Sequence, residues 1–194
     1  SCYAPSETPI RDELKSARAF AETLGQPFWV VGGDVWLAAE RYHSDGPKAA
    51  LEDLEHALNG ASALGIQLLM RYQEALLAHA YACEGRHEDA ERLWAKIHTP
   101  KNRECNRMLW PELLRLRAEA RRLAGAKDAE ILGDLDQAEK MARQQGALAW
   151  LAQIYGTRRR LQLSPADTSR DKLKKLVSNG GKQHPAIIAA MADS

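Results

Sequence analysis

The sequence contains one group of residues with the chemistry of a metal site: His79, Cys83 and His87. Residues four apart share one face of a helix, and both imidazole nitrogen and thiolate sulfur suit zinc. Gly85 interrupts the predicted helix between Cys83 and His87, so the third group need not converge on the other two. We therefore expect no metal here: His79 faces a groove, Cys83 packs as a small apolar group and His87 starts the next helix.

The sequence motifs of common enzyme classes are missing. The chain has neither the GxxxxGKS/T nor the GxGxxG phosphate loop, and it lacks the GxSxG, HExxH and deaminase patterns. The histidines outside the group above each stand apart from a candidate nucleophile. We therefore expect a chain that is not an enzyme and binds no cofactor, with a metal-dependent enzyme centred on that His–Cys–His group as the alternative.

Charge is almost balanced overall but unevenly distributed. The 27 Lys and Arg residues against 26 Asp and Glu residues give no global attraction to nucleic acid or an anionic membrane. Residues 157–182 nevertheless hold eight basic and two acidic side chains, without interleaved aromatic residues that could stack on bases. We expect a solvated helix face or a protein contact here rather than nucleic acid. The candidate basic patch comprises Arg158, Arg159, Arg160, Lys172, Lys174 and Lys175.

Length and composition suit a large helical domain or a repeat array in the cytoplasm. The longest apolar stretches are far shorter than the roughly 20 residues that a membrane span requires. Cys2, Cys83 and Cys105 are an odd number at wide spacing, which favours a reducing compartment. The chain opens on Ser-Cys-Tyr without a signal-peptide pattern, so we expect a segment of a larger cytoplasmic protein.

Helix-breaking residues recur along the chain with a period of about 40 residues. Gly46, Gly85 and Gly125 each follow a long amphipathic run and stand 39 and 40 residues apart. Glycine often ends a helix because it adopts the left-handed conformation without strain, and Asn tolerates that conformation too. Two further series keep the same period: turn residues at Gly25, Gly65, Asn106 and Gly146, and large apolar residues at Trp29, Leu69, Trp110 and Trp150.

The period predicts an all-α fold of tandem antiparallel helix-turn-helix units of about 40 residues. Ala, Leu, Glu and Arg are abundant, and no segment sustains the two-residue alternation of a strand. We expect a leader at 1–9, the repeat domain at 10–163, and a capping helix with a basic tail at 164–194. The predicted helices cover 10–24, 27–44, 47–64, 66–84, 87–98, 108–124, 128–145, 147–163 and 166–178, with an extended turn at 99–107.

The helix predicted over 108–124 shows its two faces clearly. Spacings of three and four place residues on one side of a helix, so we expect the apolar residues at these spacings to form the core face. Residues of alternating charge lie on the opposite face, where neighbouring pairs can stabilise the helix. The repeating tryptophans are also expected in the core, since they recur with the unit. The core face is Leu109, Leu113, Leu116, Ala120 and Leu123, and the charged face is Glu112, Arg115, Glu119 and Arg122.

Part of the chain resembles the tetratricopeptide (TPR) repeat. Tyr81, Gly85, Ala90 and Trp94 occupy the spacing of that signature, in which a small residue on the second helix lets the first helix pack closely. Residues 25–163 are similar to a longer variant found in the carboxyl-terminal regions of bacterial signalling ATPases, including LuxR-type and winged-helix transcriptional activators and ATPase-linked nucleotide cyclases. The segments that carry this likeness are 63–81, 110–119 and 142–150.

The resemblance implies a TPR-like superhelix that acts in signal transduction and transcription regulation. It implies a non-catalytic sensor or docking region that binds a protein or peptide in a concave groove lined by successive first helices. A small-molecule effector bound in the same region is the alternative, and self-association through the end faces stays open. Departures from the family pattern are Glu74, Gly133 and the tail after Leu163. The residues nominated for the groove are Trp36, Glu40, Tyr72, His79, Arg115, Glu119 and Arg122.

Overall fold

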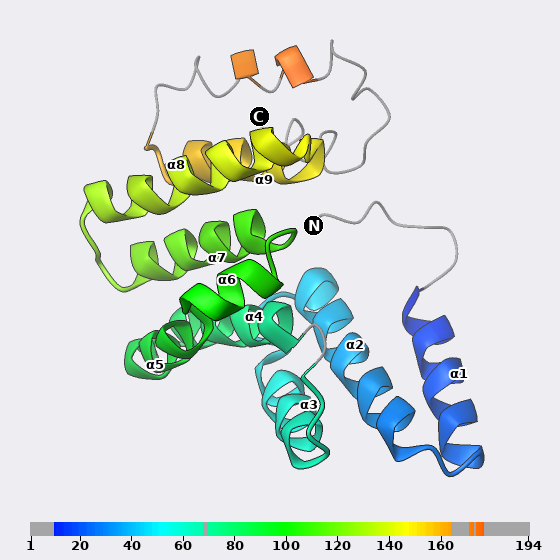
Figure 1. Ribbon diagram of the computed structural model, residues 1–194. Helices are drawn as coiled ribbons and strands as arrows, with labels where there is room; N and C mark the ends of the chain where they lie inside the picture. Colours follow the sequence, from blue (N-terminus) through cyan, green and yellow to red (C-terminus); the bar gives the residue numbers. More distant parts are fainter. Residues whose placement is uncertain (1–9, 68–69, 164–170, 173, 177–194) are drawn as a thin grey trace. The chain divides into compact units, whose positions relative to one another are not determined.

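The computed structural model describes residues 10–67, 70–163, 171–172 and 174–176. All regular structure in these ranges is helical and none of it is a strand, which confirms the predicted all-α fold (Figure 1). Within the same ranges, no helix combines the length and the hydropathy that crossing a membrane would take.

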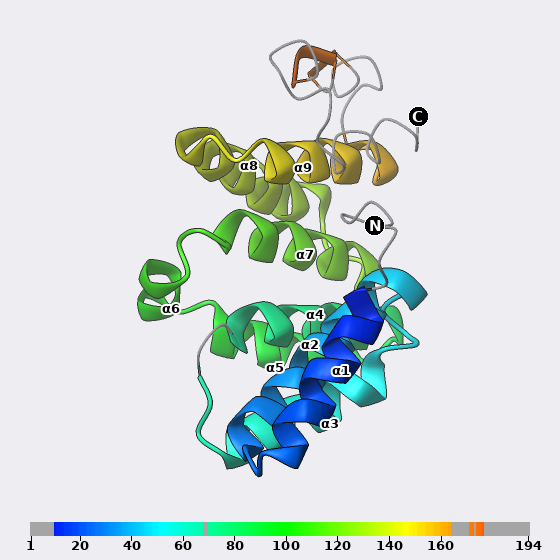
Figure 2. The ribbon, with the colours of Figure 1, turned by 90° about the vertical axis from the view of Figure 1, so that its right-hand side faces the viewer.

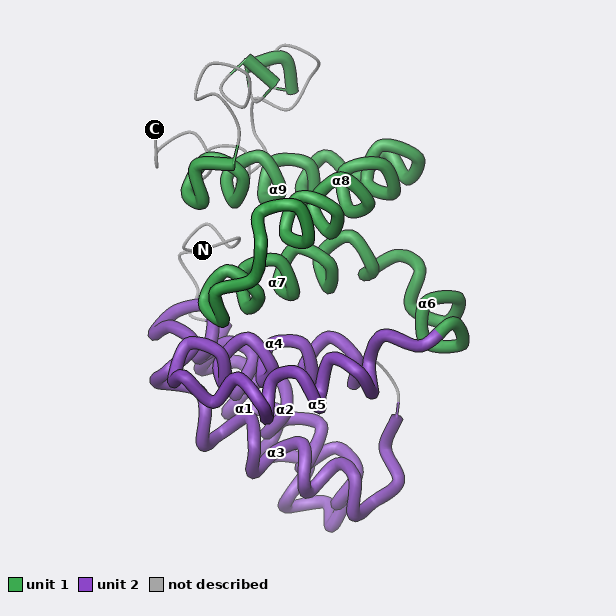
Figure 3. The backbone as a smooth tube through the Cα atoms, turned by 90° about the vertical axis from the view of Figure 1, so that its left-hand side faces the viewer, with its two compact units in different colours: residues 1–4, 100–194 green, residues 5–99 purple. Residues whose placement is uncertain are grey.

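The chain divides between Thr99 and Pro100 into two compact units (Figure 3). The continuous domain at 10–163 therefore stays a prediction. Unit 2 contains α1 (Ile10–Thr23), α2 (Pro27–Asp45), α3 (Leu51–Ala63), α4 (Met70–Cys83) and α5 (His87–Ile97). Unit 1 contains α6 (Pro100–Cys105), α7 (Trp110–Leu123), α8 (Asp128–Gln145) and α9 (Leu148–Arg160).

Consecutive helices in unit 2 pack against one another, from α1 through α5 (Figures 1 and 2). Beyond these neighbours, α2 also packs against α4. By the 40-residue period, α2 and α4 are first helices, and α1, α3 and α5 are second helices. The core between them is built mostly from small and branched apolar side chains such as Val35, Leu54, Ala57 and Leu76.

In unit 1, α7 and α9 are the first helices and α8 is the second helix that lies against both. The first helices α7 and α9 also contact each other. Leu113, Leu116, Ile131, Leu135 and Ile154 are almost completely buried and form the centre of this unit. The predicted apolar face of α7 is therefore confirmed in its middle, while Leu123 at its end is exposed.

The glycines predicted as helix breakers all have positive φ. Gly85, between α4 and α5, has φ 77°, a value that a residue with a Cβ reaches at a steric cost. The same holds at Gly25, Gly46, Gly65, Gly125 and Gly146. Asn106 does not share this conformation, so its expected role as a stand-in for glycine is wrong. Gln162, with φ 55°, ends α9 in the same left-handed region.

The region around Asn106 differs from the prediction for a physical reason. The extended turn expected over 99–107 is instead the short helix α6. Pro100 opens α6, and proline suits the first turn of a helix because its missing N–H has no partner there in any case. The side-chain amide of Asn106 donates a hydrogen bond of 2.8 Å to the Asn102 carbonyl, which closes the helix without a left-handed residue.

The tryptophan series is buried unevenly. Trp110 is almost fully buried, as predicted, and Trp150 is half-buried. Trp29, at the start of α2, is 65% exposed, so its assignment to the core is wrong. Equivalent positions in the repeat thus differ in the helices that cover them. The helix predicted at 166–178 falls mostly outside the described residues.

Candidate functional site

In unit 2 the first helices α2 and α4 are connected by two hydrogen bonds between tyrosine and histidine. The Tyr42 hydroxyl lies 2.7 Å from His79 Nδ1, and the Tyr72 hydroxyl lies 2.9 Å from His43 Nε2. The His43 and Tyr72 rings are stacked with their centroids 6.3 Å apart. Cys83 Sγ lies 3.8 Å from His79 Nδ1. The cluster thus presents two imidazoles, two phenols and a thiol on adjoining helices.

Helical spacing explains why these residues meet. Tyr42 and His43 belong to the last turns of α2, while Tyr72, His79 and Cys83 follow one face of α4 at spacings of seven and four. Tyr42 and His79 are buried, whereas His43 and Tyr72 are half-buried. Each hydroxyl and ring nitrogen restricts its partner's rotation, so the exposed edges are held in one orientation.

Trp36 and Glu40, also nominated for the groove, are one turn apart on α2. Trp36 is 44% exposed. Glu40 is half-buried and accepts a hydrogen bond of 2.6 Å from Arg11 Nε of α1. Of the four groove residues predicted in unit 2, Tyr72 and His79 therefore join one cluster, while Glu40 connects α2 to α1.

Gln73 is a buried polar residue that sequence reasoning missed. Its side chain is 1% exposed, and neither its amide nitrogen nor its amide oxygen has a partner among the described residues. The next residue, Glu74, is also buried but is paired with Arg71 and, at 2.8 Å, with Lys96 Nζ of α5. The signal for both was a run of polar residues inside a helix that is otherwise rich in Ala and Leu.

In unit 1 a guanidinium, rather than tyrosine and histidine, connects the first helices α7 and α9. Arg115 donates two hydrogen bonds to Glu112, of 2.7 Å from Nε and 2.6 Å from Nη2. Its Nη1 lies 2.8 Å from Glu119 Oε2 and donates to Thr157 Oγ1 of α9 at 3.1 Å. Glu112, Arg115 and Thr157 are buried, so the charges are matched inside the protein.

Two further α9 contacts extend this network. The Thr157 hydroxyl donates a hydrogen bond of 2.9 Å to Glu119 Oε1, and Arg160 also pairs with Glu119. Arg122, the last groove residue, is exposed and points to different partners, Asp128 at 2.6 Å and the Leu161 carbonyl at 3.1 Å. Arg115 and Glu119 therefore come together, and Arg122 lies apart from them.

A second buried ion pair joins α7 to α8. Asp134 of α8 receives both Arg117 and Arg121 of α7, with Arg121 Nη1 2.9 Å from Asp134 Oδ2. Arg117 and Asp134 are buried, and the contact is bidentate. Paired, hydrogen-bonded geometry of this kind is what allows charges to be buried.

The members of the candidate basic patch are distributed over different environments. Arg158 is buried and pairs with Asp136 of α8 at 2.6 Å, while Arg160 pairs with Glu119 of α7. Lys172 is half-buried and lies 3.3 Å from Glu139. Arg159 is half-buried, and Lys174 and Lys175 are exposed. Much of the positive charge of this segment is thus matched by carboxylates within unit 1.

Glu139 is the carboxylate on which several of these groups converge. Arg143 Nη2 lies 2.9 Å from Glu139 Oε1, and the Tyr155 hydroxyl donates to the same oxygen at 3.0 Å. Burial by itself would raise the pKa of Glu139, but the hydrogen bonds from Arg143 and Tyr155 and the charge of Lys172 hold that pKa below its ordinary value of 4.5. Burial, followed by the nearby charge of Glu139, raises the pKa of Tyr155.

The three residues of the His–Cys–His group lie on two helices. His79 and Cys83 are adjacent on α4, whereas His87 is the first residue of α5, beyond Gly85. Across the described ranges, no three His, Cys, Asp or Glu side chains are grouped so that they could hold a metal ion.

Comparisons with models of known protein families, with curated proteins and with solved structures gave no match for this chain.

Proposed function

We propose that the chain is a non-catalytic interaction module that binds a segment of protein or peptide along its first helices. The observation that carries this proposal is the pair of Tyr–His contacts between α2 and α4, at 2.7 and 2.9 Å. They hold hydrogen-bonding and aromatic groups in fixed positions on adjoining first helices, of which His43 and Tyr72 keep part of their surface exposed.

The order and the types of the side chains on this face both favour recognition of a partner. Side chains that are already ordered lose little conformational entropy when a partner binds. Tyrosine contributes a large rigid contact area with one polar atom, and for that reason it is enriched among the residues that dominate binding energies. Imidazole and phenol also provide donors and acceptors for the backbone of an extended peptide.

By its resemblance to the repeat regions of bacterial signalling ATPases, the module would serve as the docking or sensing region of a transcriptional regulator or signalling ATPase. The partner would then be a protein segment whose binding is reported to an output domain. Recognition of this segment requires no catalytic group from the chain, only a row of side chains in fixed positions.

Selection from a library of random dodecapeptides displayed on phage tests this proposal. We expect selected peptides, synthesised and labelled with fluorescein, to bind the intact protein with at least tenfold weaker affinity after Tyr72→Ala or His43→Ala. Glu88→Ala, an exposed substitution on α5, is the matched control and should leave affinity unchanged. Failure to select any binding peptide would contradict the proposal. So would selected peptides whose affinity neither substitution changes.

A further inference from the structure

The second helices α1, α3 and α8 share a sequence register that the turn glycines align. Residues counted back from Gly25, Gly65 and Gly146 repeat the pattern of an aliphatic residue, then Leu, Ala and Ala, at spacings of four, three and four. The four equivalent sets are Ile10, Ala50 and Ile131; Leu14, Leu54 and Leu135; Ala17, Ala57 and Ala138; and Ala21, Ala61 and Ala142.

These equivalent positions are buried in α3 and α8 but partly open in α1. The members of the four sets that are counted back from Gly65 and Gly146 are each at most 3% exposed. In α1, Ile10 is 41% exposed and Ala17 is also exposed. The reason is packing: α3 lies between α2 and α4, and α8 between α7 and α9, whereas α1 packs against α2 and no described first helix covers its other side.

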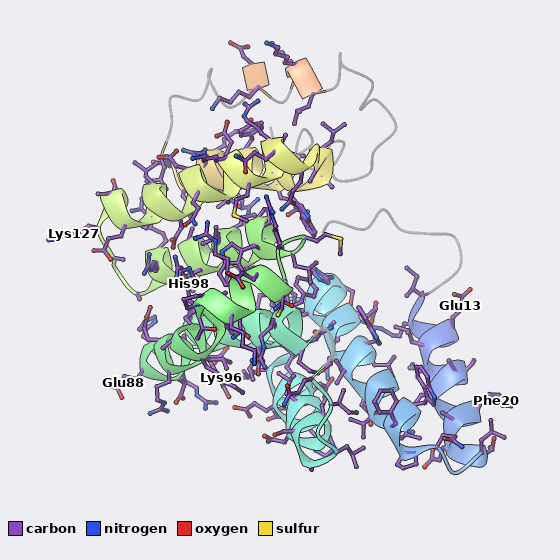
Figure 4. All side chains as sticks on the ribbon, in the orientation of Figure 1. Glu13, Phe20, Glu88, Lys96, His98 and Lys127 are labelled. Atoms are coloured by element: carbon purple, nitrogen blue, oxygen red, sulfur yellow. The ribbon has the colours of Figure 1, made fainter. Side chains whose placement is uncertain are left out.

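The open side of α1 is a continuous stripe. Ile10, Glu13, Ala17, Phe20 and Leu24 follow one another at spacings of three, four, three and four, and all five are exposed. Figure 4 shows the Glu13 and Phe20 side chains projecting away from the α1 ribbon. We call this set of five residues the α1 stripe.

Trp36 on α2 shows the same absence of a covering helix. The equivalent positions in the later first helices α4 and α9 are Leu76 and Thr157, and both are fully buried. Thr157 contacts the preceding first helix through Arg115, and Leu76 lies between Tyr72 and His79 on the face that is bonded to α2. In α2 that position is Trp36, which keeps 44% of its surface exposed.

The charge in the stripe indicates what kind of helix would cover it. Glu13 is equivalent to Asp53 of α3 and Asp134 of α8. Each of these aspartates pairs with arginine from the first helix of its own repeat: Asp53 with Arg41 of α2 at 2.7 Å, and Asp134 with Arg121 of α7 at 2.9 Å. Glu13 forms no ion pair with any residue that the structure describes, so it is available for an arginine on a covering helix.

We propose that the α1 stripe docks an amphipathic α-helix of a partner polypeptide. That helix runs antiparallel to α1, places small and aliphatic residues over Ile10 and Ala17, and directs an arginine to Glu13. A folded second copy of the chain is a poor donor, because each first helix in the described ranges already packs against at least one second helix. This surface is separate from the Tyr–His face of α2 and α4, so either proposal can fail without the other.

A peptide of residues 108–125, which contains α7, is the probe because α7 covers the matching face of α8. Fluorescence anisotropy of this labelled peptide with the intact protein should give saturable binding. We expect Ala17→Arg, which places a long charged side chain in the stripe, to weaken binding at least tenfold. Glu13→Arg should weaken it at least fivefold, while the control Glu88→Arg on α5 leaves it unchanged.

A charge exchange tests the predicted pairing directly. A peptide with Arg117→Glu and Arg121→Glu should bind the unaltered protein at least fivefold more weakly and should regain affinity for the Glu13→Arg protein. Circular dichroism checks that the variants, all at exposed positions, keep their helix content. If Glu13→Arg loses helix content, Glu13→Gln replaces it in the binding measurements.

Three outcomes would overturn the proposal. The first is no saturable binding of the peptide. The second is binding that Ala17→Arg does not weaken, which indicates that the peptide replaces α7 in unit 1. The third is a dimer in sedimentation equilibrium that Ala17→Arg dissociates, which assigns the stripe to a second copy.

Discussion

The two units connect neighbouring first helices with opposite chemistry. In unit 2, α2 and α4 are joined by hydrogen bonds between tyrosine and histidine. In unit 1, α7 and α9 are joined by Arg115, which is shared among Glu112, Glu119 and Thr157. The contact between consecutive first helices is thus formed by polar aromatic groups in unit 2 and by buried charges in unit 1.

The two kinds of contact differ in how well they tolerate a substitution. A hydrogen bond between tyrosine and histidine contributes about 0.5–1.5 kcal/mol, and its loss leaves groups of modest polarity. A buried ion pair gives little net stability, but removing one partner leaves a buried charge and costs about 3–5 kcal/mol. We therefore expect unit 1 to be far more sensitive than unit 2 to a single substitution at this contact.

The largest expected effect is that of Arg115→Met. It leaves the Glu112 carboxylate, which is 1% exposed, without its guanidinium, and we expect the free energy of unfolding to fall by about 3–5 kcal/mol. Urea unfolding followed by circular dichroism measures this change. The double variant with Glu112→Gln should recover more than half of the loss, and a double variant no better than the single one would show that the unpaired charge is not the cause.

Glu139→Gln tests whether the charges around α9 stabilise unit 1 in a pH-dependent way. At pH 7 we expect a loss of about 2 kcal/mol, because hydrogen bonds to a charged group contribute about 1.5–3 kcal/mol. The pKa of Glu139 is lowered in the folded protein, so the stabilisation is present above pH 4.5 and is lost as the pH falls through the folded-state pKa. Urea unfolding of both proteins from pH 7 to pH 3 should show the difference shrinking, and a constant difference would contradict this assignment.

In unit 2, Tyr42→Phe should lower the free energy of unfolding by about 1.5 kcal/mol. The substitution keeps the ring and removes the hydroxyl bonded to the buried His79. Tyr72→Phe is the matched control on α4 and should cost less, because Tyr72 and His43 are half-buried and water can replace the lost bond. Equal losses of unfolding free energy in the two variants would show that burial does not make the Tyr42–His79 bond stronger than the Tyr72–His43 bond.

Gln73→Met should raise the free energy of unfolding by about 1 kcal/mol. Gln73 is buried with neither amide atom bonded to a described residue, and methionine has a similar length without polar atoms to desolvate. Thermal unfolding measures the gain, and Gln144→Met on the exposed end of α8 is the neutral comparison. A loss of stability at Gln73 would indicate that its amide has a partner that the described residues do not provide.

Much of the fold follows from local signals in the sequence. The glycines at the 40-residue period end helices because a left-handed residue is required there, and all six of them have positive φ. Among the described residues, the predicted helix limits agree within a few residues except at 99–107, where Pro100 starts α6, and at 47–50, which is a turn before α3. The limits of the helix predicted at 166–178 lie outside the described residues. The Gly133 noted as a departure from the repeat pattern lies inside an unbroken α8.

The candidate site was predictable in part. The spacing of Glu112, Arg115 and Glu119 on one helix predicted their pairing, because residues three and four apart are neighbours. The burial of Glu112 and Arg115 was not predictable, because alternating charges on a helix face usually indicate a face exposed to solvent. The partners Tyr42 and His79 are 37 residues apart, and no local rule connects them.

The helices, their turns and the 40-residue period follow from local sequence, because these features depend on the conformations that each residue and its near neighbours prefer. Which helix faces are covered depends instead on tertiary packing. Ile10 and Ile131 occupy equivalent positions, yet the first is open and the second is buried, because burial depends on the helix packed opposite and not on the residue itself.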